Sequence, residues 1–250
     1  QVYTSNPNFQ ISNEEQNEES ERSNKLTKKD EDQNQQNKLN KKITQDNIVY
    51  SINENEKTAW VVDNESAYGD ILIPHSIKHE SNEYIITKIC ENSFAKSKSI
   101  KSIQFPVNSE IKTIEKNAFE NSSLKSISIP STLIELNDGW CSGTSKLTKI
   151  NISQNNQRYL LYDDKIIIGK KSIENDEMHE ILVFCVRDIK MIQIPNFIKI
   201  IGPYSFEYCT ELQNVEFSSN SELRIIEYRS FSSCIIEKIK FPVHLEKIGG

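Results

Sequence analysis

One phrase recurs along this chain, and it restricts the fold more than any other feature of the sequence. Copies of it stand at residues 99–106 (SIKSIQFP), 123–130 (SLKSISIP) and 188–195 (DIKMIQIP). A second phrase follows the first, as IEKNAF at residues 114–119 and as IGPYSF at residues 201–206. Units that recur in this way stack into a solenoid, in which each unit buries its apolar residues against its neighbours. The repeat therefore predicts a solenoid.

The spacing of aromatic residues gives the length of a unit. Phe94 and Phe119 are 25 residues apart, and so are Phe206 and Phe231. We expect Trp140 to take the same aromatic position in the unit between them, after a shorter step. Lengths of about 20 to 29 residues are typical of leucine-rich repeats. The predicted fold is a leucine-rich-repeat solenoid of the α/β horseshoe class, rich in strands, with short irregular or helical convex segments.

Alternate residues of the phrase have opposite roles. Successive side chains of a strand point to opposite faces, so Ile127 and Ile129 should point inward while Ser126 and Ser128 point outward. Equivalent strands should stack about 4.8 Å apart as a parallel sheet, and each ends at a proline, which lacks the N–H that a ladder needs. We expect the outward residues to line one concave face and to bind a ligand. They are Ser102, Gln104, Ser126, Ser128, Lys149, Asn151, Met191, Gln193, Asn214, Glu216, Lys238 and Lys240.

Composition divides the chain into five segments. Residues 1–46 have too little apolar surface to offset the entropy of ordering, which predicts a disordered polar tail. Residues 47–92 are expected to form a cap of β-hairpins and the first repeat, with one hairpin made by residues 48–52 and 58–62 and another ending at residues 84–87. Repeats follow at residues 93–152, a β insertion at 153–186, and a second block of repeats at 187–250.

The last repeat of this sequence is truncated. Ile248 and Gly249 should be followed by an aromatic phrase, which is absent. The final rung would then expose an apolar edge unless it were paired or continued. We expect the chain to be a fragment of a longer array, or to use its open C-terminal edge for self-association.

The sequence offers no residues for chemistry. It has no Gly-x-Ser-x-Gly, P-loop or Gly-x-Gly-x-x-Gly sequence, and its four histidines are scattered, so we expect no catalytic residue, cofactor or metal site. Asp163 and Asp164 most simply mark a turn, although a hydrolase using that loop is a minor alternative. A net charge of −6 disfavours nucleic-acid binding. No apolar run approaches the roughly 18 residues of a membrane span.

The five cysteines do not form a recognisable framework. No pair has the Cys-x-x-Cys spacing of zinc or thioredoxin-type sites. Cys209 and Cys234 occupy the same position in successive repeats, where adjacent rungs would bring their backbones within disulfide reach. We expect two small buried thiols there instead, because stacked parallel Cβ vectors often fail the geometry of a disulfide.

The repeat resembles the BspA-like leucine-rich repeats, also called the Treponema pallidum type. The pattern L-x-x-I-x-I-P-x-x-[LVI]-x-x-I-[GE]-x-x-[AS]-F-x-x-C is matched by residues 103–119, 192–209 and 215–234, and residues 70–94 are similar to the family's usual first unit. The sequence departs from this pattern at Trp140, where the family has Ala-Phe, and at Cys90 and Glu227, where it often has Gly. The resemblance covers residues 48–250.

The resemblance implies a function that the residues alone do not. Members of this family are mostly surface or secreted proteins of bacteria and parasitic protists, associated with adhesion to host cells, matrix proteins and other microbes. It therefore implies a non-enzymatic surface-antigen-like module that binds a protein or glycan through its concave face, at the cell surface or secreted. The alternative from another class is an intracellular scaffold for protein–protein interaction.

Overall fold

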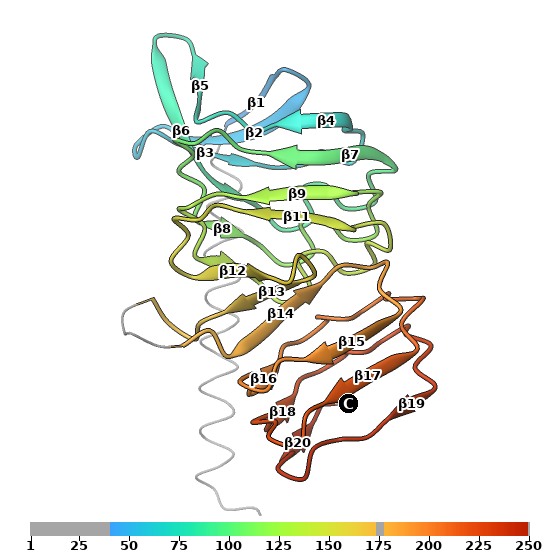
Figure 1. Cartoon of the computed structure of the whole chain (residues 1–250). Helices are drawn as coiled ribbons and strands as arrows, with labels where there is room; N and C mark the ends of the chain where they lie inside the picture. Colours follow the sequence, from blue (N-terminus) through green and yellow to red (C-terminus); the bar gives the residue numbers. More distant parts are fainter. Residues whose placement is uncertain (1–40, 174–177, 250) are drawn as a thin grey trace, which may run out of the picture. The chain divides into compact units, whose positions relative to one another are not determined.

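The computed structural model describes residues 41–173 and 178–249, which form strands and turns and contain no helix (Figure 1). The strands are β1 (Lys41–Gln45), β2 (Ile48–Asn53), β3 (Thr58–Val61), β4 (Tyr68–Leu72), β5 (Ser76–His79), β6 (Asn82–Ile89), β7 (Ser99–Gln104), β8 (Thr113–Ile114), β9 (Ser126–Ile129), β10 (Glu135–Leu136), β11 (Lys149–Ile152), β12 (Tyr159–Tyr162), β13 (Ile166–Gly169), β14 (Ile181–Cys185), β15 (Met191–Ile194), β16 (Ile200–Ile201), β17 (Asn214–Phe217), β18 (Ile225–Ile226), β19 (Lys238–Ile239) and β20 (Lys247–Ile248).

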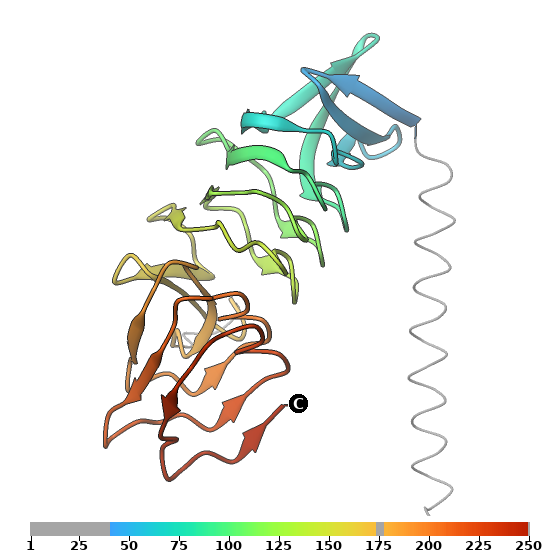
Figure 2. The ribbon, with the colours of Figure 1, turned by 90° about the vertical axis from the view of Figure 1, so that its right-hand side faces the viewer.

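These strands form four sheets. Sheet A has the order β1-β2-β3-β6-β8-β10, with β5 paired to β6, and sheet B has the order β11-β9-β7-β4. Sheet C has the order β12-β13-β14-β16-β18-β20, and sheet D has the order β15-β17-β19. A typical rung contributes a recurring-phrase strand to sheet B or D and a two-residue strand, such as β8 or β16, to sheet A or C. The stacked rungs therefore show two sides (Figure 2). We call the rungs of sheets A and B the first block and those of sheets C and D the second block.

The parallel stacking predicted for the recurring phrase is confirmed. In sheet B, β9 pairs with β11 so that Ile127 lies opposite Ile150, and in sheet D, β15 pairs with β17 so that Ile192 lies opposite Val215. Ile127 and Ile129 are each only 1% exposed. Ser126 and Ser128 alternate with them on the outward side and are half-buried. The period of two within each phrase thus decides which side chains enter the core.

Phenylalanine rings run through the core of both blocks. The rings of Phe94 and Phe119 stack with centroids 5.2 Å apart and planes 4° apart, and those of Phe206 and Phe231 stack at 4.9 Å and 11°. Phe94, Phe119 and Phe206 are fully buried, and Phe231 is partly buried. Within each pair, the ring of one rung covers the ring of the next, as expected for units that cannot bury their apolar groups alone.

Residues 153–186 contain antiparallel strands, unlike the repeats. The strands β12 and β13 form a hairpin, β13 pairs antiparallel with β14, and β14 then pairs parallel with β16. All three strands belong to sheet C, so none of the strands that the structure describes joins β11 of sheet B to β15 of sheet D. The segment therefore continues one side of the stack and interrupts the other.

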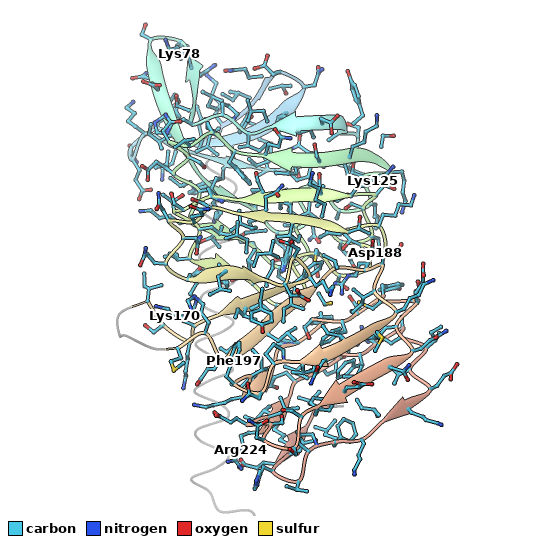
Figure 3. All side chains as sticks on the ribbon, viewed as in Figure 1. Lys78, Lys125, Lys170, Asp188, Phe197 and Arg224 are labelled. Atoms are coloured by element: carbon cyan, nitrogen blue, oxygen red, sulfur yellow. The ribbon has the colours of Figure 1, made fainter. Side chains whose placement is uncertain are left out.

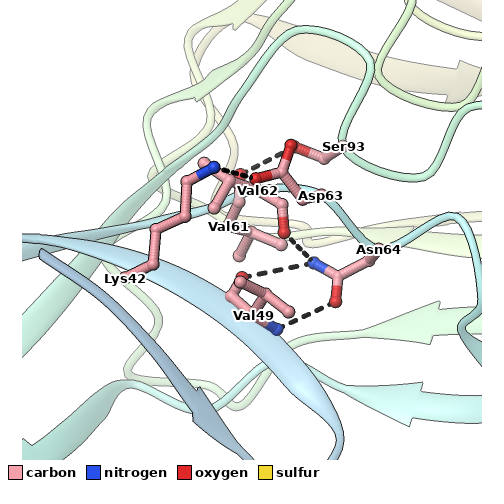
Figure 4. A network of polar contacts seen from close by, with 7 residues as sticks. All are labelled: Lys42, Val49, Val61, Val62, Asp63, Asn64 and Ser93. Atoms are coloured by element: carbon pink, nitrogen blue, oxygen red, sulfur yellow. Dashed lines mark hydrogen bonds and ion pairs between the residues drawn. The ribbon is translucent and has the colours of Figure 1, made fainter. Parts of the chain in front are cut away.

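The N-terminal part of the described chain contains two antiparallel strand pairs, where the sequence predicts hairpins. The strands β2 and β3 are antiparallel, as are β5 and β6, while β3 pairs parallel with β6 and so begins the parallel part of sheet A. The buried side chain of Asn64 links the segment that follows β3 to β2 within this cap (Figure 4). Its Nδ2 donates to the Val49 and Val62 carbonyls at 3.2 and 2.6 Å, and its Oδ1 accepts from the Val49 amide at 2.9 Å.

The structure corrects the predicted boundary of the polar tail. Residues 1–40 of the predicted tail (1–46) lie outside the described residues, but Lys41–Gln45 forms β1, next to β2 in sheet A. Ile43 packs against the core, and Lys42 forms an ion pair with Asp63 at 2.5 Å. A single apolar residue is enough here because β2 offers a strand to pair with, which composition could not show.

The expected position of Trp140 was wrong. The amide of Phe94 donates to the Ala118 carbonyl at 2.7 Å, and the amide of Phe119 donates in the same way to the Trp140 carbonyl at 2.8 Å. Trp140 therefore takes the position of Ala118, and Cys141 takes the position of Phe119. The pairing of Ile114 with Leu136 gives the same offset of 22 residues.

Two glycines of that rung support this alignment. Gly139 and Gly143 have φ of 70° and 73° where the previous rung has Asn117 and Asn121 at 57° and 52°. A Cβ at Gly143 would come within 2.2 Å of the Asn121 side chain, so this rung needs glycine there.

We predict that removing one inward isoleucine weakens the whole stack more than removing an outward residue. Ile127→Ala should lower the free energy of unfolding by about 2–5 kcal/mol, because Ile127 is buried between rungs. Ser128→Ala should change it by less than about 1 kcal/mol. Urea denaturation followed by tryptophan fluorescence measures both values, and equal losses in the two variants would contradict the assignment of faces.

Candidate functional site: two outward faces and the joint between them

The structure places six of the twelve candidate residues on the outward face of sheet B, which we call face B. Register pairing aligns Ser102, Ser126 and Lys149 in one row and Ser128 with Asn151 in another. Gln104, Lys149 and Asn151 are exposed. Ser102 is only 5% exposed, because its hydroxyl donates to the Asp70 carboxylate at 2.6 Å. It is therefore a poor candidate for contacting a ligand directly.

Sequence reasoning missed the outward residues of β4. Asp70 pairs with Ser102 and Leu72 with Gln104, which extends both rows by one strand. Tyr68 and Leu72 are 66% and 60% exposed and give face B its only large exposed apolar side chains among the described residues. The sequence pattern could have identified these residues. Asp70 and Leu72 stand at the same distances before Pro74 as Ser126 and Ser128 do before Pro130.

The other six candidates lie on or next to the outward side of sheet D, which we call face D. Met191, Asn214 and Lys238 form one row, and Gln193 pairs with Glu216 in a second. Lys240 directly follows β19. All six are exposed, and the side chains standing on these strands are visible in Figure 3. Face D is the more charged of the two.

The twelve residues line two faces, and not the single face expected from the sequence. The reason is that β12–β14 join sheet C, so β11 and β15 do not pair. A hollow of about 850 Å³ lies against β15, between Met191–Ile194 and the turn of the β12–β13 hairpin. The hairpin turn includes Asp163, whose carboxylate pairs with Lys165 at 2.7 Å in an exposed position.

A buried arginine, Arg187, lies where the two blocks meet. We call the region around it the joint. The amide of Cys185 donates to the Ser205 carbonyl at 2.9 Å, as that of Phe206 does to the Ser230 carbonyl, so Cys185 takes the phenylalanine position of its rung. Cys141 and Cys185 therefore replace phenylalanine in two successive units. Arg187 is only 2% exposed, and its guanidinium lies 4.4 Å from the ring centroid of Phe184.

Thiols surround this guanidinium. Arg187 donates to the Ser205 carbonyl at 3.0 Å and lies 3.7 Å from the Cys209 sulfur and 3.9 Å from the Cys141 sulfur. Its Nε has no hydrogen-bond partner in the described part of the chain. A buried cation without a carboxylate is costly, and a neighbouring thiolate would offset that cost. Cys209 and Cys234 are free thiols in the structure, buried and partly buried respectively.

The pKa values of the thiols differ because their surroundings differ. A hydrogen bond from Cys185, together with the Arg187 guanidinium, lowers the pKa of Cys209, although burial opposes this. Burial raises the pKa of Cys141 to about 11 and raises that of Cys185 well above its usual value. The arrangement therefore favours a thiolate at Cys209 and neutral thiols beside it.

A second polar contact crosses the joint. Glu207 of the second block is only 3% exposed, and its Oε2 accepts from the Ser142 hydroxyl at 2.7 Å and from the Gly143 amide at 3.2 Å. A carboxylate buried with two donors is stable, whereas one left without them would be strongly destabilising. Glu207 therefore fastens the second block to the turn of the first.

Nothing in residues 41–173 and 178–249 gathers into a metal-binding group of histidine, cysteine, aspartate or glutamate. A recess of about 240 Å³ at the joint is lined by Trp140, Tyr159, Phe184 and Tyr204, among other residues. Residues 41–173 and 178–249 include no helix that could cross a membrane.

We predict that Cys209 makes the stability of the stack depend on pH. A thiol whose pKa is lowered by folding contributes stability that is complete above its unfolded pKa of about 8.5 and is lost as the pH falls through the lowered value. The difference in free energy of unfolding between the unaltered chain and Cys209→Ala should therefore increase as the pH rises from about 6 to 8.5. Urea denaturation across this range measures it.

Taking the difference between the two proteins cancels the titration of other groups. Cys141 and Cys185 stay protonated in this window because their pKa values are raised. A difference that did not vary with pH would show that the Arg187–Cys209 contact carries no thiolate.

Comparison with known proteins agrees with the fold. A search of curated proteins gives no significant match. Among solved structures, a leucine-rich repeat protein from Eubacterium ventriosum is similar, with a TM-score of 0.51 and 16% identity over 82% of this chain. This chain spans 66% of the length of that protein. The pneumococcal vaccine antigen PcpA is also similar, with a TM-score of 0.41 and 15% identity over 84% of this chain and 78% of that one.

The family comparison is more specific. A model of the BspA type leucine rich repeat region matches six copies, over residues 74–162 and 179–250. These ranges contain the strands of sheets B and D from β7 onward and both sides of the joint. The stacked rungs, the repeated proline-ended strands and this match together show that the chain belongs to the BspA-type leucine-rich-repeat family.

Proposed function

We propose that the chain is a non-enzymatic binding module that recognises a protein or glycan ligand through faces B and D. The observation that carries the proposal is the set of rows in which exposed side chains stand at the fixed spacing of a parallel sheet. A rigid array of this kind loses little conformational entropy on binding, so several weak polar contacts can act together. Membership of the BspA-type family is consistent with this role.

The two faces differ in what they offer to a ligand. Face B combines the exposed Tyr68 and Leu72 with polar groups that include Asp70 and Lys149. Face D has Lys238 and Lys240 beside Glu216. Aromatic anchors and charged residues at the rim are common features of protein interfaces. We further propose a surface or secreted location and an adhesive role, which the family resemblance supports.

We predict that charge reversal on face D weakens ligand binding. The chain would first be screened against extracellular-matrix proteins, glycans and host cells. Lys238→Glu with Lys240→Glu should then reduce affinity for the ligand found by more than tenfold, because both lysines are exposed next to Glu216 and would now add to its charge.

A matched pair controls for net charge. Lys112→Glu with Lys116→Glu changes the charge equally, at exposed residues flanking β8 in sheet A. Equal losses of affinity in both double variants would indicate a non-specific charge effect and would count against face D.

Self-association through the last strands stays a prediction. The strands β19 and β20 are the final strands of sheets D and C, and Val243 and Ile248 near them are 89% and 56% exposed. Pairing between two such edges would bury both residues. Light scattering should then show a mass that rises with concentration, and a clean monomer at high concentration would argue against this association.

A further inference from the structure

The strand β15 has one backbone edge that pairs with no strand among residues 41–173 and 178–249. It is the first strand of sheet D, and β17 lies on its other side. The Lys190 carbonyl accepts from the Gln213 and Asn214 amides at 2.9 and 3.4 Å, so it points toward β17. Peptide groups alternate in direction along a strand, so those of Ile192 and Ile194 also face β17, whereas those of Met191 and Gln193 face away.

The peptide groups of Met191 and Gln193, which face away from β17, have no partner in the described part of the chain. No strand pairs with that side of β15, and no turn donates to it or accepts from it. Met191 and Gln193 therefore each offer an N–H and a C=O at the free edge. By contrast, β11, the other strand at the interruption, has β12 packed beside it and the Arg187 amide bonded to Leu147 just before its start, at 3.1 Å.

The free edge opens into the 850 Å³ hollow. All four residues of β15 line it, together with Tyr162, Asp163 and Lys165 at the β12–β13 turn. Ser218 and Asn220, after β17, line the hollow as well. The Ser218 hydroxyl is buried and has no hydrogen-bond partner among the described residues. A volume of this size suits a bound segment, since ligand sites commonly measure about 300–1,000 Å³.

The chemistry of the lining favours a neutral polar occupant with some apolar side chains. The lining charges Asp163 and Lys165 neutralise each other, and Gln193, Asn196 and Asn220 contribute amides. Met191 is 58% exposed and Tyr162 is 40% exposed. Tyr162 is held in place against Phe197, with ring centroids 5.8 Å apart; Phe197 is labelled in Figure 3.

We propose that an extended polypeptide segment of a partner protein adds to sheet D as a strand along the free edge of β15. The inference rests on the proposed binding function and specifies one partner chemistry. Free N–H and C=O groups two residues apart match the backbone of an extended peptide, which supplies the same groups at the same spacing. Alternate side chains of the added strand would contact Met191 and Tyr162 on the outward side.

The experiment begins with a library of linear heptapeptides screened against the full chain. The best binder is synthesised, and each of its amides is methylated in turn. We expect methylation at every second residue to weaken binding more than tenfold, because those N–H groups donate to β15. Methylation at the intervening residues should weaken it less than threefold. An absence of binders, or losses without this alternation, would overturn the proposal.

Two protein variants test the same edge from the other side. Gln193→Pro removes an N–H that bonds nothing within the fold, and proline is tolerated on an edge strand when its nitrogen faces outward. It should abolish peptide binding. Gln193→Ala removes the side-chain amide that lines the hollow but keeps the backbone N–H, so it should weaken binding measurably and by clearly less than Gln193→Pro does. If Gln193→Pro fails to fold by circular dichroism, the alternation in the methylated peptides decides the question.

The same assay separates this inference from the proposed function. Lys238→Glu with Lys240→Glu alters face D away from β15 and should leave heptapeptide affinity within threefold. Loss of heptapeptide binding in that double variant would place the peptide on face D and overturn strand addition. A ligand that loses affinity in this variant but not in Gln193→Pro would support face D and count against the β15 edge.

Discussion

The burial of isoleucine and phenylalanine between neighbouring rungs is the interaction on which the rest of the structure depends. A single rung has one inward strand on each side and exposes its apolar residues above and below. Only the next rung covers them, as the stacked rings of Phe94 and Phe119 show. Each fully buried isoleucine contributes roughly 1.5–3 kcal/mol, and the contribution is shared between neighbours. This stacking of the inward residues also sets the spacing between the outward side chains of faces B and D.

At the joint, other residues replace the phenylalanine that is buried between rungs elsewhere. Cys141 and Cys185 stand where phenylalanine stands in other rungs, and Arg187 with Trp140 and Phe184 fills the space. A guanidinium in this position needs acceptors, and the joint supplies a carbonyl, an aromatic face and thiols. Glu207 adds a bond across the same boundary. The core thus continues through the interruption, although one of the two sheet sides does not.

This difference between core and sheet has a consequence for binding. Because the core is continuous, faces B and D belong to one compact unit, which includes residues 42–173 and 178–249. Because β11 and β15 are not paired, the surface between the faces is a hollow beside a free strand edge. A regular stack would have covered that edge with the next strand. The insertion therefore adds a kind of binding surface that the repeats alone do not offer.

The repeated phrase by itself determined the solenoid, the inward and outward sides of each strand and the identity of eleven exposed or half-exposed candidate residues. These are local properties, because a period of two and a proline stop act within one strand. The same rule could have found Asp70 and Leu72, which precede Pro74. It could not show that Ser102 is buried, since the cause is the Asp70 carboxylate on a neighbouring strand.

Only the tertiary structure decided the pairing across the insertion. The position of Cys141 depends on hydrogen bonds to the rung before it, and the burial of Arg187 depends on residues more than 40 positions away, such as Cys141. The free edge of β15 exists because β12–β14 belong to sheet C and not to sheet D. Strand pairing is a contact between segments distant in the chain, and a repeat pattern describes only the segments themselves.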